Sequence, residues 1–268
     1  MASSEKSSGG IAETFKTVFW ALFLAGIIRT ILFQPFWIPS GSMKPTLLIG
    51  DFLFVNKFTY GFSWASCPTI GSYNLCGFAK DWDGRLLESV PERGDIIVFK
   101  HPSSEADYIK RLIGLPGDKV QVIKGRLHIN NQPVDLVDAG VFSEEYGPQG
   151  PLGNRPRCAN GAVGIGGNCT KEAALETLPG GVTHTILDIV NGQGDNTSVY
   201  AVPEGNYFFM GDNRDNSIDS RFAPPYGVGM VPASYLVGRA DRVMFSSAGS
   251  SILAFWTWRS DRFFKGLE

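Results

Sequence analysis

Apolar residues are concentrated in one segment near the start of the chain, from Phe15 to Ile38, which follows a polar stretch at residues 1–12. Few side chains of the polar stretch could be buried, so we expect it to be disordered. The apolar segment reaches the roughly 20 residues of a membrane-spanning helix if Arg29 extends its charge to the interface. We therefore predict a transmembrane anchor at residues 13–35. The alternative is a cleaved signal peptide, but no small-x-small cleavage site follows the apolar core.

Beyond residue 50, short runs of β-branched and aromatic residues alternate with turn residues, which is typical of β-strands. The strands expected on this pattern lie at residues 51–57, 96–100, 107–114, 120–123, 126–130, 206–210 and 237–245. From Pro133 to about Val202 clear periodicity is lost, and we expect a loop-rich segment with short strands such as 183–190 and 198–202. The fold class predicted is mainly β.

This pattern also predicts how the chain is divided. A core domain is expected to combine residues 36–58, 88–132 and 206–246. Residues 59–87 and 133–205 are expected to form an inserted, non-catalytic subdomain that is rich in β-structure. Residues 247–268 form a tail of aromatic and basic residues. The tail is interpreted either as a helix that caps the domain or as a segment that lies on lipid headgroups.

The charges and the cysteines restrict the possible functions. Lys and Arg number 24 against 26 Asp and Glu, which gives no electrostatic reason to expect a nucleic acid partner. The four cysteines form two local pairs, Cys67 with Cys76 and Cys158 with Cys169, and their spacing does not match a zinc site. Disulfides in these pairs indicate an oxidising compartment, with the N-terminus inside and the domain outside. Four unpaired thiols in a cytoplasmic protein are the alternative.

The candidate chemistry begins directly after the apolar segment, where Ser40 and Ser42 flank Gly41. This arrangement suggests a nucleophile with an oxyanion donor beside it. A serine needs a base, and the chain has only three histidines, none of which lies in an organised setting: His101, His128 and His184. A Ser-His-Asp triad is therefore not favoured.

A lysine base is the alternative to a histidine. Lys110 lies on the same face of an expected strand as Tyr108 and Leu112, where burial would lower its pKa and leave a neutral amine to accept the serine proton. Lys44 competes by proximity, but residues two positions apart rarely reach the geometry of proton transfer. We therefore favour Lys110.

Four motifs of the chain, in this order, resemble those of the type I signal peptidases: Pro39–Leu47, Arg93–Phe99, Tyr108–Asp118 and Gly211–Arg221. Members of this family are membrane-bound serine endopeptidases that remove signal peptides from exported proteins. The resemblance implies an antiparallel β-sheet catalytic core with an inserted β-rich subdomain, preceded by one transmembrane helix. It also implies the bacterial inner membrane, with the N-terminus cytoplasmic and the catalytic domain periplasmic.

The resemblance also assigns roles to residues. It makes Ser42 the nucleophile and Lys110 its general base, with an oxyanion hole formed by the Ser42 backbone N–H and the Ser40 hydroxyl. Ser217 is expected to orient the lysine, and Asp219 and Arg221 to form a supporting ion pair. The walls of the substrate pockets, which accept small side chains of a small-x-small site, are expected to be Phe36, Ile38, Pro39, Met43, Leu47, Tyr108 and Ile109. For Phe36 and Leu47, plain core packing is an equal alternative.

Three other functions compete with this one. Self-cleaving repressor-like proteins share the Ser-Lys pair but are soluble and carry a DNA-binding domain. A pilin- or conjugation-associated relative would act on one substrate, and a membrane-anchored binding protein would lack a member of the pair. We expect no cofactor and no metal, and the expected partners are preprotein signal peptides, membrane lipid and the export machinery. The chain departs from some family members in its single anchor and its additional cysteine pair.

Overall fold

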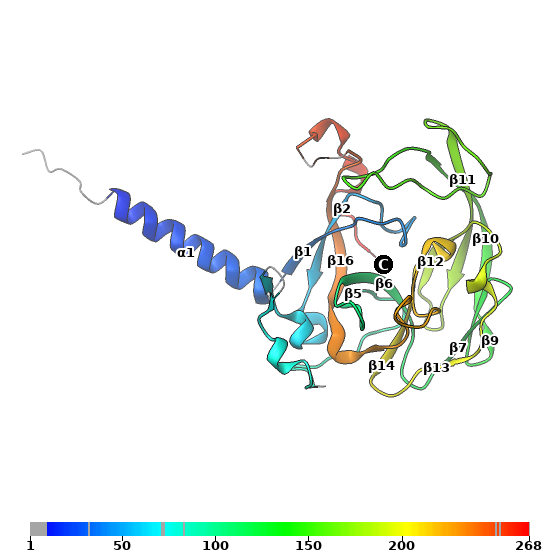
Figure 1. Cartoon of the computed structure of the whole chain (residues 1–268), viewed down its shortest axis with the longest axis horizontal. Coiled ribbons are helices and arrows are strands. Elements are labelled where there is room, and N and C mark those ends of the chain that lie inside the picture. The colour runs from blue at the N-terminus through cyan, green and yellow to red at the C-terminus, as the bar shows by residue number, and fades with distance from the viewer. Residues whose placement is uncertain are drawn as a thin grey trace, which may run out of the picture.

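The computed structural model describes residues 10–31, 33–70, 73–82, 84–249, 251 and 253–267. Within these residues one α-helix, α1 (Gly10–Ile31), projects away from a body of β-strands (Figure 1). The strands form four sheets, and their pairs are antiparallel. The prediction of a mainly β fold is therefore confirmed.

The largest sheet has seven strands and contains the predicted core strands except those at 120–123 and 126–130, which lie in a smaller sheet. Their order across the sheet is β1 (Phe33–Trp37), β2 (Asp51–Asn56), β16 (Leu236–Ser246), β5 (Ile96–Lys100), β6 (Asp107–Gly114), β14 (Asn206–Met210) and β15 (Val231–Pro232). Because β1 is an edge strand, one side of its backbone is available to another chain segment.

The remaining strands form three smaller sheets. A four-stranded sheet contains β13 (Tyr200–Ala201), β7 (Lys119–Ile123), β8 (Arg126–Ile129) and β9 (Gln132–Pro133). A three-stranded sheet contains β10 (Asp135–Glu145), β11 (Asn168–Thr177) and β12 (Thr183–Asp188). A two-stranded ribbon contains β3 (Thr69–Ile70) and β4 (Tyr73–Asn74). Single 3-10 turns occur at Phe58–Tyr60, Trp64–Ser66, Gly77–Ala79, Gln193–Asp195, Arg214–Asn216, Ala233–Tyr235, Phe255–Thr257 and Ser260–Arg262.

The core lies on both faces of the seven-stranded sheet because side chains alternate along each strand. In β5, Ile96 and Val98 pack into a cluster with Met43 and Leu47, whereas Ile97 and Phe99 pack into a second cluster on the opposite face. A third cluster joins β6 and β14 to the four-stranded sheet. The segment Pro39–Leu47 is therefore anchored by its own apolar residues in the main core.

Strands β10 and β11 were not predicted, although they are among the longest of the fold. Most side chains of β10 are exposed, so this segment lacks the apolar alternation by which strands are recognised. In β11 the buried positions include the charged residues Lys171 and Glu176, which hides the alternation in the sequence. The structure also pairs β13, from the segment predicted as an insert, with β7. The predicted division into domains remains a prediction.

The N-terminal segment differs from the expectation in two respects. Residues 1–9 lie outside the described part, but residues 10–12 are helical rather than disordered, because they extend α1 with Glu13 in its first turn. Across the residues that the structure describes, no helix combines the length and the apolar character required to cross a membrane. The transmembrane helix predicted at residues 13–35 is therefore not confirmed.

The C-terminal tail folds back on the main sheet without forming an α-helix in its described part. Arg262 donates from Nε and Nη2 to the Asp51 carboxylate and from Nη2 to the Thr46 carbonyl oxygen, at 2.9, 2.5 and 2.9 Å. Arg259 donates from Nη1 to the Ile49 carbonyl oxygen at 3.0 Å. These bonds support the capping interpretation, with 3-10 turns in place of the expected helix.

Both cysteine pairs are joined as disulfides, Cys67 with Cys76 and Cys158 with Cys169. The second bond links a loop before β11 to the start of that strand. Because the loop runs beside Pro39, as described below, the disulfide also helps to place it near the serines.

Candidate active site

Ser42 lies in a tight turn that follows strand β1. Ile38 still pairs with the β2 side, since its N–H donates to Asp51 O at 2.9 Å and its carbonyl accepts from Gly50 N at 3.0 Å. The turn is closed by a bond from Lys44 N to Gly41 O at 3.3 Å, and Met43 is fully buried beneath it. Ser42 is only 7% exposed, so its hydroxyl is held in a fixed and poorly hydrated position.

Lys110 of β6 lies directly against this serine. Its Nζ donates to Ser42 Oγ at 2.7 Å and to the Ile109 carbonyl oxygen at 3.0 Å. The side chain is 4% exposed, and burial lowers its pKa to about 8, although the carboxylates of Asp219 and Asp212 oppose that shift. A substantial fraction of this amine is therefore neutral at moderately alkaline pH.

Ser40 is close to Ser42 but more open to solvent. Its Oγ lies 3.4 Å from Ser42 Oγ, and the residue is exposed. The two hydroxyls thus lie on the same side of Gly41, as the spacing predicted. The role of Ser40 as an oxyanion donor stays a prediction.

The motif Gly211–Arg221 brings three predicted residues to the same place. Arg221 donates from Nε to Asp219 Oδ1 at 2.9 Å, and both side chains are buried. Burial would raise the pKa of Asp219, but the adjacent Arg221 lowers it overall. A Cβ added to Gly211 would lie 2.3 Å from Ser217 Oγ and 2.5 Å from Ser42 O, so Ser217 lies close to Ser42. The recorded hydrogen bonds of the Lys110 amine do not include Ser217.

Two residues of the same motif that contact the segment around Ser42 were not identified from the sequence. Asn213 donates from its side chain to Gly41 O at 2.9 Å and from its backbone to Ser42 O at 3.0 Å. The buried Asp212 accepts from Arg111 at 2.9 and 2.8 Å and from the Thr46 hydroxyl at 2.5 Å. The sequence could have indicated both residues, because Asp212 and Asn213 belong to the motif that contains Ser217.

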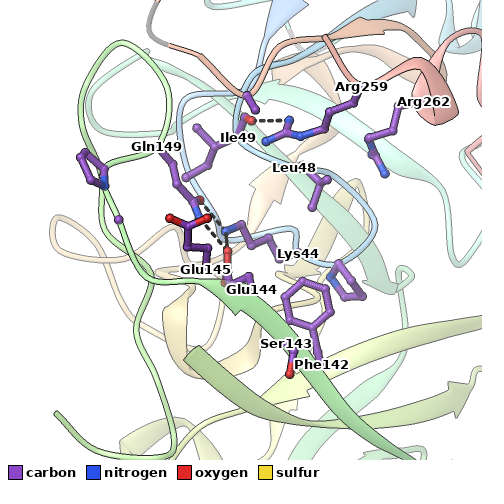
Figure 2. Close-up of a pocket in the computed structure, with 14 residues that line it drawn as sticks. Lys44, Leu48, Ile49, Phe142, Ser143, Glu144, Glu145, Gln149, Arg259 and Arg262 are labelled. Carbon is purple, nitrogen blue, oxygen red and sulfur yellow. Dashed lines mark hydrogen bonds and ion pairs between the residues drawn. The ribbon is translucent and has the colours of Figure 1, made fainter. Parts of the chain in front are cut away.

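A third group that was not identified from the sequence connects the turn that carries Ser42 to the three-stranded sheet. The ammonium group of Lys44 donates to Glu144 of β10 and, at 2.7 Å, to the side-chain oxygen of Gln149 (Figure 2). Glu144 also accepts from the ammonium group of Lys171. The two lysines are 3% and 1% exposed. Burial would raise the pKa of Glu144, but Lys44 and its other partners lower it overall. Lys44 is thus engaged by Glu144 and Gln149, and none of its recorded bonds reaches Ser42.

The predicted pocket residues divide into two groups. Ile38, Met43 and Leu47 are at most 2% exposed and belong to the main core. The remaining four are partly exposed: Phe36, Pro39, Tyr108 and Ile109. For Leu47 the structure favours the core-packing alternative.

The histidines lie away from this pair. His101 is buried and accepts from the backbone of Ser103 and Ser104, and His184 is buried between Glu176 and Asp212, where burial lowers its pKa to about 4. Within the described part of the chain, no group of three potential metal ligands is found. The group that contacts Ser42 Oγ is therefore the buried amine of Lys110 rather than an imidazole.

Comparisons with known proteins show which family the chain resembles. A family model described as signal peptidase, peptidase S26, matches residues 11–245. Signal peptidase I of Rickettsia typhi is 35% identical over 253 residues, which cover 90% of this chain and 83% of that protein. Signal peptidase I of Rickettsia akari is 34% identical over 258 residues, covering 91% and 85%. A crystal structure of a signal peptidase I from Enterococcus faecalis is 30% identical, covers 56% of this chain and 97% of its own, and has a TM-score of 0.29.

The chain belongs to the signal peptidase family, peptidase S26. The resemblance of its four motifs to this family is confirmed, and with it the predicted enzyme class, a serine peptidase of the signal peptidase I type.

Proposed function

We propose that this enzyme removes signal peptides from exported preproteins and that Ser42 and Lys110 form its catalytic pair. The observation that carries the proposal is the 2.7 Å contact between Lys110 Nζ and Ser42 Oγ, made by two buried side chains. A buried amine with a pKa of about 8 can accept a proton that an ordinary, fully charged lysine could not.

In the first half of the reaction, neutral Lys110 takes the proton of Ser42 Oγ while this oxygen attacks the scissile carbonyl. The tetrahedral intermediate collapses to an acyl-enzyme, and the leaving amine receives the proton from the Lys110 ammonium. In the second half, Lys110 takes a proton from water, which attacks the ester. The proton returns to Ser42 as the acid product leaves.

The oxyanion of the intermediate is proposed to accept hydrogen bonds from the Ser42 backbone N–H and the Ser40 hydroxyl. One such donor contributes about 10²–10³ in rate. Ser217 is proposed to orient the lysine amine, and the ion pair of Asp219 with Arg221 to fix the Gly211 segment. Asp219 serves this purpose because its Oδ2 also accepts from Gly211 N at 3.0 Å.

The proposed substrate class is supported by the family and by the edge strand β1, which precedes Ser42 in the chain. We propose that the peptide lies along the edge strand β1, with small side chains of a small-x-small sequence against Phe36, Pro39, Tyr108 and Ile109. Strand addition of this kind supplies backbone hydrogen bonds for affinity and shallow pockets for specificity.

We also propose that the enzyme works at the bacterial inner membrane, with a cytoplasmic N-terminus, a periplasmic catalytic domain and access to the export machinery. Large apolar side chains of α1 support this location, because Phe15, Leu22 and Leu24 are 57–73% exposed and lie on a helix that projects from the body. Trp256 and Phe264 of the tail are also exposed, at 76% and 63%. Aromatic residues of this kind are favourable at lipid headgroups. The two disulfides fit the periplasm.

The proposal is tested with the purified protein and a preprotein that carries a small-x-small site. Cleavage is followed by sequencing the new N-terminus, and Ser42→Ala and Lys110→Ala should each abolish it without changing the circular dichroism spectrum. The exposed Lys119 provides a matched control, because Lys119→Ala should retain activity. Full activity of Lys110→Ala would rule out the proposed base.

A further inference from the structure

A cavity of about 210 Å³ begins at Ser40 and Gly41, directly beside the proposed oxyanion hole. Its opposite wall is the segment Asn154–Arg157, which precedes β11. None of the pocket residues proposed for the upstream part of the substrate lines it. The cavity is thus distinct from the proposed upstream pockets and adjoins the turn at Ser40 and Gly41.

The wall of the cavity is held in place at both of its ends. Asn154 donates from its side chain to the Pro39 carbonyl oxygen at 2.8 Å, so the segment is fixed against the chain just before Ser40. Cys158, one residue beyond Arg157, is bonded to Cys169 of β11. Arg155 and Arg157 are consequently placed beside the serines by defined contacts, although both side chains are exposed.

The lining of the cavity is strongly basic. Lys44, Lys171, Arg155 and Arg157 contribute four positive charges, and Glu144 contributes the single carboxylate. Glu144 is already engaged by both lysines. Arg157 donates to the backbone carbonyl of Asp215, which leaves its charge uncompensated, and no ion pair to Arg155 or Arg157 occurs among the described residues.

We propose that this cavity is a subsite for an acidic side chain of the substrate within the first three residues after the scissile bond. The inference rests on the proposed function, because the bound peptide is the preprotein. An Asp or Glu carboxylate meets two guanidinium groups at the rim and the lysine-rich wall behind them. Guanidinium groups can bind a carboxylate through two parallel hydrogen bonds.

The test uses three pairs of peptides with the same small-x-small site, which differ only in Asp or Asn at the first, second or third residue after the cleavage point. The subsite predicts that kcat/KM is about threefold to tenfold higher for Asp at one of these positions. The ratio should fall toward one in the Arg155→Gln/Arg157→Gln double variant. It should also fall in 0.5 M salt, because screening weakens exposed charge pairs.

Arg242 offers a matched control, since it is another exposed arginine whose Nη1 donates to a backbone carbonyl, that of Phe264, at 3.3 Å. Arg242→Gln should keep both the rate and the Asp to Asn ratio. Equal cleavage of Asp and Asn peptides at all three positions would overturn the subsite, as would a preference that survives in the double variant. If neither the Asp peptides nor the Asn peptides are cleaved, the proposed function itself is overturned. This outcome is distinct from equal cleavage of both, which overturns only the subsite.

Discussion

The titration of Lys110 is the most direct consequence of the site geometry. An exposed lysine with a pKa of 10.5 is almost entirely charged at pH 7, whereas a pKa of about 8 leaves about a tenth of the molecules neutral at pH 7 and about half at pH 8. Because only the neutral amine can accept the serine proton, kcat/KM should rise about tenfold per pH unit at acidic pH and level off above about pH 9.

The sign of this effect follows from the burial of the amine. Burial disfavours the ammonium form, so the active form gains population as the pH rises through the lowered pKa, and acidification removes it. The assay is the initial rate of cleavage of a peptide without ionisable side chains, measured from pH 5.5 to 10. Circular dichroism at each pH confirms that the protein stays folded.

Two variants separate Lys110 from other titrating amines. Burial also lowers the pKa of Lys44, and Lys44→Met should leave the inflection of the pH profile near pH 8. The exposed Lys119→Ala variant should do the same. A rate that is flat from pH 6 to 9 would refute the reasoning, and so would an inflection that disappears with Lys44.

Three further predictions concern stability and cofactors. Glu144→Ala leaves the buried Lys44 and Lys171 without their carboxylate and should lower the free energy of unfolding by about 3–5 kcal/mol in urea titrations. The variant Glu145→Ala, at the exposed neighbouring position, should change it by less than about 0.5 kcal/mol. Equal effects of the two variants would contradict a stabilising role of Glu144 between the two lysines. Replacing Cys158 and Cys169 by Ser opens a loop with a separation of 11 residues and should cost about 2–4 kcal/mol in the same titration, and an unchanged midpoint would argue against that contribution. EDTA should leave peptide cleavage unchanged, and an inhibition that added zinc reverses would show that a metal takes part.

The sequence predicted those parts of the fold that follow local patterns. The strands β2, β5, β6 and β14 were recognised because they carry short runs of β-branched and aromatic residues between turns. Strand β10 was missed because its exposed side chains provide no such pattern.

The candidate site was predicted where residue type and motif coincide, as for Ser42 and Lys110. The contacts that position the turn carrying Ser42 were not predicted. Lys44 and Glu144 are 100 residues apart, and Asn213 and Gly41 are 172 apart, so only the folded chain brings them together. No spacing rule within a single segment indicates such pairs.

The bond between Arg262 and the turn that carries Ser42 has a consequence for how the enzyme is made. Arg262 donates to the carbonyl oxygen of Thr46 and to the carboxylate of Asp51, which accepts from Leu48 N in the same turn at 2.8 Å. A nascent chain shorter than 262 residues lacks this support, however completely its earlier strands have paired. The bonds of Arg262 to Thr46 and Asp51 can therefore form only late in biosynthesis, after residue 262 has been added.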